Sequence, residues 1–357
     1  FIATYGNFIV INGATGERIR QVSFVSGGVN GRNYGDLIVR DIDNDGYLEG
    51  IIIADAVCEH VAVIDNDEFE STLRWDHYYE FDYVNGQQND IQLKSHMNSL
   101  ADIDDDGEYE IVLSIFDGTD PDMYNGERTA FDNGKWNVVI IGTETGSLKQ
   151  YIEDAYVHGI VDMNNDNKYE LILTYEPDPS LRASSNVLVY AYNGSEFVKV
   201  FETAERTALV KQTGLPYPSY QGSIARTAGI DIFTCDVDGD GNLEIFYGNK
   251  CATYNGTEVV EKNISIQGTP KLLKDYNDNG KIDLFTIYNS HLNIYELPDL
   301  SSPVSSNILR STTSLNNSPI AADLDGDGNK EVLIQTSNTI KCYKTNSQGA
   351  SLYWEIE

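Results

Sequence analysis

The sequence is poor in the residues that build soft-metal sites and reactive centres. Its 357 residues include 4 Cys, 5 His and 3 Met. The four cysteines, Cys58, Cys235, Cys251 and Cys342, show neither CxxC spacing nor neighbouring histidines, so we expect no zinc site. Cys235 and Cys251 fall within one repeat, on strands that we do not expect to be adjacent. We therefore favour buried free thiols over a disulfide.

Long apolar runs and positive charge are also scarce. No stretch of about 18 uncharged apolar residues occurs, so membrane insertion is not expected. The chain has 24 basic against 56 acidic residues and a net charge of −32. Such a field repels nucleic acid, which is therefore not an expected partner. The start at Phe1, without a signal-peptide apolar core, suggests a processed or trimmed start.

Catalytic motifs are missing as well. The sequence has no G-x-S-x-G motif and no pair of histidines at metal-binding spacing. The five histidines are dispersed, and we interpret each as structural. A calcium-assisted lyase would still need a basic residue, and Lys94 and His96 remain candidates for that role. We interpret the chain as a binding or structural module before an enzyme.

The acidic residues are concentrated in six short loops that repeat the pattern D-x-D-x-D-G-x-x-E or a close variant. Numbered one to six in chain order, the loops span residues 41–49, 102–110, 162–170, 236–244, 275–283 and 323–331. Positions within each loop are numbered 1 to 9. Six copies in one chain indicate an internal repeat, which decides the fold.

The segments beside the loops predict strands. Short runs rich in Ile, Val, Leu and Phe precede and follow each loop, as in residues 36–39 and 50–54, and they are too short for helices. Two more strands follow in most units. Four strands per unit is typical of a β-propeller blade.

We predict an all-β fold, a seven-bladed β-propeller of four-stranded antiparallel blades in a single domain spanning 1–357. The first blade is incomplete, because residues 1–22 supply its second, third and fourth strands without the inner strand or a loop. The predicted blades span residues 1–28 (partial), 34–84, 94–153, 154–203, 226–266, 268–312 and 316–357.

The loop and its flanking strands resemble the FG-GAP/VCBS repeat, as found in the propeller of integrin α-subunits. The resemblance extends over nearly the whole chain through its repeats. It implies a propeller fold, calcium in the loops, and an extracellular or periplasmic location; we expect a secreted or cell-surface protein. It does not imply one function, because such propellers serve in adhesion, in structural assemblies and in some polysaccharide lyases.

The loop chemistry independently favours Ca²⁺, about six ions at one per loop. Calcium takes six to eight oxygen ligands, and alternating side chains at positions 1, 3, 5 and 9 can surround one ion, with a carbonyl from position 7. An EF-hand is excluded, because its closing Glu stands at position 12 between helices. The predicted ligands are Asp41, Asp43, Asp45, Glu49, Asp102, Asp104, Asp106, Glu110, Asp162, Asn164, Asp166, Glu170, Asp236, Asp238, Asp240, Glu244, Asp275, Asn277, Asn279, Asp283, Asp323, Asp325, Asp327 and Glu331.

The loops differ in charge. The first, second, fourth and sixth carry four carboxylates at these positions, the third carries three, and the fifth carries only Asp275 and Asp283. Fewer charges attract a cation less, so we expect the fifth site to lose its ion first.

Three long insertions, residues 76–95, 117–135 and 204–229, are candidate surfaces for a protein or glycan ligand. The first contains His77, Tyr78, Tyr79 and Tyr83, which either stack on sugar rings or pack within their own loop. We expect a structural or adhesion module, with a lectin-like or polysaccharide-lyase propeller as the alternative. An added strand on the incomplete blade would allow self-association into filaments. Sequons at Asn193, Asn255, Asn263 and Asn316 permit glycosylation.

Overall fold

The structure is a computed structural model of the 357-residue chain. It describes residues 1–4, 7–23, 35–54, 59–79, 82–84, 87–89, 92–94, 99–116, 136–175, 185–207, 209, 211–212, 231–275, 279–288, 291–300, 303, 305–308, 320–328, 330–335, 339–346 and 349–356. Within these ranges the chain forms strands and turns without a helix, which confirms the predicted all-β class. Accordingly, no described helix has the length and apolar character needed to cross a bilayer.

Seven sheets of three to five strands account for most of the described residues. The first three sheets contain β1 (Ile2–Thr4), β2 (Asn7–Ile11) and β3 (Arg18–Ser23); β4 (Gly35–Arg40), β5 (Glu49–Ala54), β6 (Glu59–Asn66) and β7 (Ser71–Tyr79); and β10 (Gln92–Lys94), β11 (Leu100–Ala101), β12 (Glu110–Phe116), β13 (Trp136–Gly142) and β14 (Leu148–Ile152).

The remaining four sheets have four strands each. They contain β15 (Tyr156–Val161), β16 (Glu170–Thr174), β17 (Val187–Tyr192) and β18 (Phe197–Glu202); β21 (Thr234–Cys235), β22 (Glu244–Tyr247), β23 (Lys250–Tyr254) and β24 (Val259–Asn263); β25 (Thr269–Lys274), β26 (Asp283–Tyr288), β27 (His291–Glu296) and β28 (Ser305–Ile308); and β29 (Ile320–Ala322), β30 (Glu331–Gln335), β31 (Ile340–Asn346) and β32 (Gly349–Ile356).

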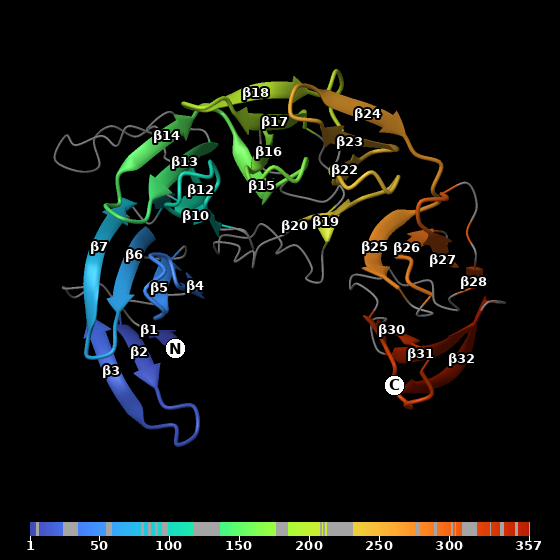
Figure 1. The fold of residues 1–357 in the computed structure, drawn as a ribbon, viewed down its shortest axis with the longest axis horizontal. Helices are drawn as coiled ribbons and strands as arrows, with labels where there is room; N and C mark the ends of the chain where they lie inside the picture. The colour runs from blue at the N-terminus through green and yellow to red at the C-terminus, as the bar shows by residue number, and fades with distance from the viewer. Residues whose placement is uncertain are drawn as a thin grey trace.

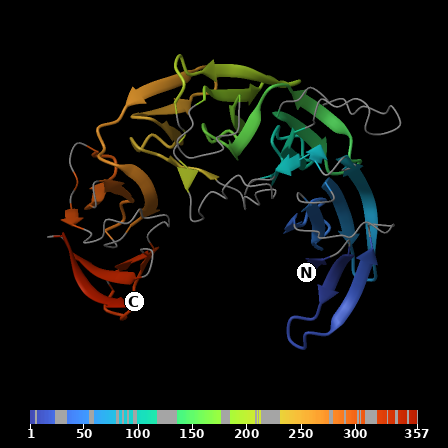
Figure 2. The same cartoon turned by 180° about the vertical axis from the view of Figure 1, so that it is seen from behind.

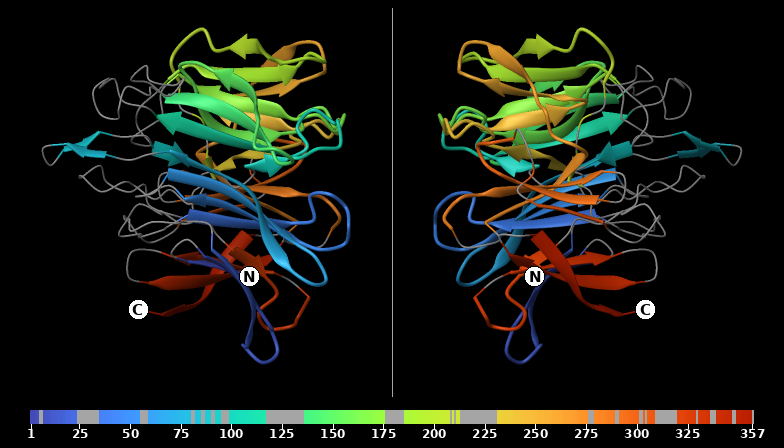
Figure 3. Two further views of the ribbon diagram at one scale, coloured as in Figure 1. Left: turned by 90° about the vertical axis from the view of Figure 1, so that its left-hand side faces the viewer. Right: turned by 90° about the vertical axis from the view of Figure 1, so that its right-hand side faces the viewer.

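The strands of each sheet pair antiparallel and in chain order, except that β10 and β11 of the third sheet both pair with β12. Figure 1 shows the sheets side by side along an arc, with the first and seventh sheets at its two ends, and Figure 2 shows the same arc from behind. Two short ribbons complete the described strands: β8 (Asp82–Val84) with β9 (Gln87–Asn89), and β19 (Lys211–Gln212) with β20 (Asp231–Ile232). The β8–β9 ribbon projects away from the sheets (Figure 3).

In inner strands of the central sheets, alternating side chains are buried against the two neighbouring sheets. In β12, Ile111, Leu113 and Ile115 pack with the second sheet, whereas Val112 packs with the fourth. Both faces of the strand are therefore apolar, which explains why the sequence shows continuous apolar runs rather than alternation. Six such apolar clusters join the seven sheets in order.

The first sheet has three described strands, as predicted, and Phe8 of β2 is its fully buried anchor against the second sheet. Among the described residues, no apolar cluster joins the first sheet to the seventh. The number of blades in the complete propeller, and its predicted division, therefore stay predictions. Cys235, Cys251 and Cys342 are buried free thiols, and Cys58 lies outside the described residues.

Candidate metal centres

Each of the six acidic loops joins two consecutive strands of one sheet, here called the first and second strand of the loop. The loops connect β4 to β5, β11 to β12, β15 to β16, β21 to β22, β25 to β26 and β29 to β30. In every case the acid at position 9 is the first residue of the second strand.

Backbone N–H groups fold each loop around its own acids. In the first loop, Asp41 Oδ1 accepts from the N–H of Asp45 at 3.2 Å and Asp41 Oδ2 from that of Gly46 at 3.1 Å. Asp45 Oδ1 accepts from the N–H of Tyr47 at 2.8 Å. The same bond from position 6 to position 1 recurs in all six loops, at 2.9–3.1 Å. The described residues of the six loops thus share this hydrogen bond, and in the loops described at position 4 they share the turn as well.

Two positions in this conformation require left-handed backbone. Position 6 has φ from 68° at Asn167 to 91° at Gly46 and its counterparts, as the glycine pattern predicts. Position 4 has positive φ as well, for example 61° at Asn44 and 76° at Gly239. The sequence analysis missed position 4, although every loop has Asn, Asp or Gly there, the residues that tolerate this region.

The acid at position 9 is buried in every loop, with an exposed fraction of at most 2%. In the five loops that end in Glu, one carboxylate oxygen accepts from the backbone N–H of position 2 at 2.7–3.0 Å. This bond fixes the carboxylate at the start of the second strand. Burial raises the pKa of Glu49 and Glu110 to about 7, of Glu170 to about 8 and of Glu244 to about 6. A nearby cation would offset that cost to the ionised form.

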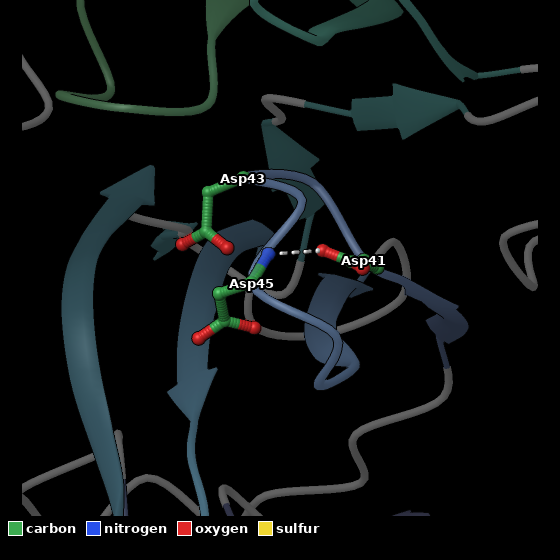
Figure 4. Close-up of side chains that lie close together, drawn as sticks. All are labelled: Asp41, Asp43 and Asp45. Atoms are coloured by element: carbon green, nitrogen blue, oxygen red, sulfur yellow. Dashed lines mark hydrogen bonds between the residues drawn. The ribbon is translucent and has the colours of Figure 1, made fainter.

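The structure gathers the carboxylates of four loops into clusters whose oxygens lie within 4.8 Å of one another. Figure 4 shows the first of these, Asp41, Asp43 and Asp45, on a single turn. The others are Asp102, Asp104 and Glu110; Asp236, Asp238 and Glu244; and Asp323, Asp325 and Glu331. In the second loop Asp106 and Glu110 also meet Glu108, a position-7 side chain that the sequence analysis did not include.

The remaining two loops are less complete. In the third, the Asn164 amide donates to Asp166 at 3.1 Å, and no cluster of three acidic, Cys or His groups forms among the described residues. In the fifth, Asn277 lies outside the described residues, and the Asn279 amide donates to Glu296 at 2.7 Å. These two loops also carry the fewest carboxylates.

Basic side chains enter several clusters. Lys149 Nζ lies 2.5 Å from Glu110, 2.9 Å from Glu108 and 3.3 Å from Asp106. Lys344 contacts Asp325 and lies 3.1 Å from Asp327. These ion pairs depend on strand register, so the sequence pattern alone did not reveal them.

Other candidate residues are only partly described. His77 Nε2 lies 2.6 Å from the Gly146 carbonyl oxygen, and its ring packs on Trp75, so its contacts in the structure are structural. Four further candidates, Tyr78, Tyr79, Tyr83 and Lys94, lie in described strands, but their own side chains are not described. His96 lies outside the described residues.

Comparison with known proteins identifies the architecture. Residues 275–334, which contain the fifth and sixth loops, match the family model of the FG-GAP-like repeat. A solved structure, the exotype rhamnogalacturonan lyase YesX, aligns with 91% of this chain and 65% of its own, with a TM-score of 0.50 and 14% sequence identity. The chain is a β-propeller that contains an FG-GAP-like repeat at residues 275–334.

Two further structures are similar to this propeller at lower scores. The rhamnogalacturonan lyase PL11 of Bacillus licheniformis has a TM-score of 0.49 and 15% identity over 94% of the propeller and 64% of the lyase. The Dos1 propeller has a TM-score of 0.37 and 9% identity, over 94% of this chain and 70% of its own. The propeller thus spans less than two thirds of either lyase chain. No curated protein sequence matches it significantly.

Proposed function

We propose that this propeller binds calcium in its loops and acts outside the cell as a binding or structural module. The observation that supports the proposal is the same hydrogen bond from position 6 to position 1 in all six acidic loops. Calcium, when bound, would supply positive charge to the carboxylates and tie the first strand of each loop to the second.

The residues present fit a hard cation. Glu244 Oε1 and Glu331 Oε1 are buried and have no hydrogen-bond partner among the described residues. A buried carboxylate oxygen without a partner is costly, and a cation at the loop would remove that cost. The donor set consists of carboxylate, amide and backbone oxygens, which suit Ca²⁺ better than a soft metal.

Calcium content measured by native mass spectrometry tests this proposal. After dialysis against millimolar calcium and brief desalting, we expect several bound ions per chain, and up to six. A matched sample in which Asp102, Asp104 and Asp106 are all replaced by Asn should lose one ion. A protein that retains no calcium would overturn the proposal.

An extracellular location is the second part of the proposal. FG-GAP repeats occur in extracellular proteins, and calcium there reaches the millimolar concentrations that fill sites of moderate affinity. Fractionating the native source and locating the protein with an antibody tests this part, and recovery from the cytosol alone would refute it.

Self-association through the first sheet belongs to the same proposal. In this sheet β1 pairs only with β2 among the described residues, so its other edge is available for an added strand. A strand donated by a neighbouring molecule would produce a head-to-tail filament. Sedimentation and electron microscopy at high protein concentration test this step, and a monodisperse monomer would exclude it.

A carbohydrate-active propeller is the second candidate. It is favoured by the fold shared with the rhamnogalacturonan lyase YesX over 91% of this chain. The cluster geometry does not itself select a sugar substrate. Incubation with rhamnogalacturonan and with other acidic polysaccharides, followed by detection of unsaturated products, separates a lyase from a glycan-binding module.

A further inference from the structure

Four of the six loops have a basic side chain from a later strand of the same sheet within ion-pair distance. In the first loop Arg74 of β7 lies 2.8 Å from Asp43, and in the second Lys149 of β14 lies 2.5 Å from Glu110. In the fourth loop Lys262 of β24 contacts Asp238 and lies 3.7 Å from Glu244. In the sixth, Lys344 of β31 contacts Asp325. The three lysines each contact at least two carboxylates of their loop, whereas Arg74 contacts one and also pairs with Asp65 at 2.5 Å.

Strand irregularities place two of these cations. The pairing of β6 with β7 shifts between Val63 and Ile64, and Arg74 is the extra residue on β7. The pairing of β13 with β14 shifts between Ile140 and Ile141, and Lys149 is the extra residue on β14. A bulge redirects the side chain of its extra residue. Both sheets therefore aim a basic side chain at their own loop by the same device.

The third loop lacks this arrangement. The pairing of β17 with β18 shifts in the same way, but the extra residue is Val200. Its neighbour Lys199 pairs instead with Glu202 at 2.5 Å. Within the described part of the chain, no Lys or Arg forms an ion pair with the acids of the third loop. Among the described residues, the third site therefore has three carboxylates and no Lys or Arg paired with them.

We propose that Arg74, Lys149, Lys262 and Lys344 are resident counter-ions that stabilise the metal-free loops and are displaced when calcium enters. The inference rests on the proposed calcium binding. Carboxylates held within a few ångströms repel one another, and a cation among them relieves that repulsion. A divalent ion at the same oxygens repels the ammonium or guanidinium, so the two compete. Calcium affinity is therefore lower in these four loops than their carboxylate number indicates.

Calorimetric titration of the full chain with calcium chloride tests the inference. Lys149→Met should bind calcium about fivefold more tightly at one site, and its metal-free form should melt at a lower temperature. Lys199→Met is the matched control, because it removes an ion pair of similar length that contacts no loop, and it should change neither calcium affinity nor stoichiometry. If Lys149→Met does not fold, Lys262→Met and Arg74→Met make the same test.

The order in which the sites fill gives a second readout. The third loop, free of counter-ions, should fill before the second, so Asp166→Asn should remove the tightest binding phase and Asp106→Asn a weaker one. Unchanged or weakened binding in all three cation variants would overturn the inference while leaving calcium binding intact. A flat titration of the unaltered protein would instead overturn the proposed function and the inference together.

Discussion

The second and fifth loops share the backbone hydrogen bonds to position 1 and differ greatly in charge. Position 1 accepts from the N–H of position 5 at 3.1 Å in the second loop and 3.2 Å in the fifth, and from that of position 6 at 3.0 and 2.9 Å. Yet the second loop carries carboxylates at positions 1, 3, 5, 7 and 9, and Lys149 forms ion pairs with several of them. At the same positions the fifth loop carries only two carboxylates, those of Asp275 and Asp283.

This comparison separates the shape of the loop from its capacity to bind an ion. One carboxylate at position 1, together with left-handed residues, is enough to fold the turn. The remaining acids add repulsion to the metal-free protein and are useful only if a cation joins them. The fifth loop shows that few carboxylates are needed to form the turn, and the second shows the additional carboxylates that would bind an ion.

Calcium removal should have the largest effect. Each site that is filled at about 100 times its Kd adds ~2.7 kcal/mol, so emptying several sites should lower the Tm by about 10 °C. Differential scanning calorimetry in millimolar calcium and in excess EGTA measures the difference, with magnesium as the control ion. A Tm that is the same in calcium and in chelator would contradict the account.

Replacing the position-9 acid should lower stability more in the second loop than in the fifth. Glu110→Gln keeps an acceptor for the Ile103 N–H, which donates at 3.0 Å, and removes the charge. We expect a loss of about 2–3 kcal/mol in calcium-saturated urea unfolding, because a filled site disappears. Asp283→Asn in the fifth loop should cost less than ~1 kcal/mol, since that site is filled least. Equal losses would show that carboxylate number does not govern occupancy.

Replacing the position-6 glycine should affect the two loops equally. Gly107 has φ of 91° and Gly280 of 85°, and no atom lies within 4 Å of an added Cβ at either position. Only backbone strain then acts, and Gly107→Ala and Gly280→Ala should each lose about 1–2 kcal/mol in EGTA. Gly13→Ala is the control, because Gly13 has open space and no positive φ. A loss confined to the charged second loop would show that shape and charge are coupled.

Adding charge to the fifth loop should have the smallest effect. Asn279→Asp supplies a third carboxylate and should raise calcium affinity at this site several-fold. The Asn279 amide lies 2.7 Å from Glu296, so the new carboxylate should cost about 0.5 kcal/mol in the metal-free protein. Competition with a fluorescent calcium chelator measures the affinity, and Asn279→Ala controls for loss of the amide contact. No gain over Asn279→Ala would contradict the prediction.

Local sequence was sufficient to predict the strands that flank the acidic loops, but not β8, β9, β10 and β19, which lie in segments predicted as insertions. The apolar runs beside each loop form strands that lie between two sheets. Residues on both faces of such a strand are apolar, as Leu113 on one face and Val112 on the other show. The position-6 glycines marked the turn because their left-handed φ is costly for other residues. Position 4 carried the same signal in Asn44 and Gly239, but no left-handed residue was predicted there.

Features that depend on long-range register could not be predicted. Lys149 reaches Glu110 only because a bulge in β14 turns it toward a loop 39 residues earlier in the chain. No sequence pattern reports where such a bulge falls. For the same reason, carboxylate number alone ranked the third loop below the second, although the structure shows that their counter-ions differ.

The most direct test of the account is a crystal structure grown in millimolar calcium, with anomalous scattering used to locate the ions. The account predicts peaks among the oxygens of positions 1, 3, 5 and 9, with the Lys149 ammonium withdrawn from Glu110 and the weakest peak in the fifth loop. Anomalous maps with no peak in any of the six loops would contradict it.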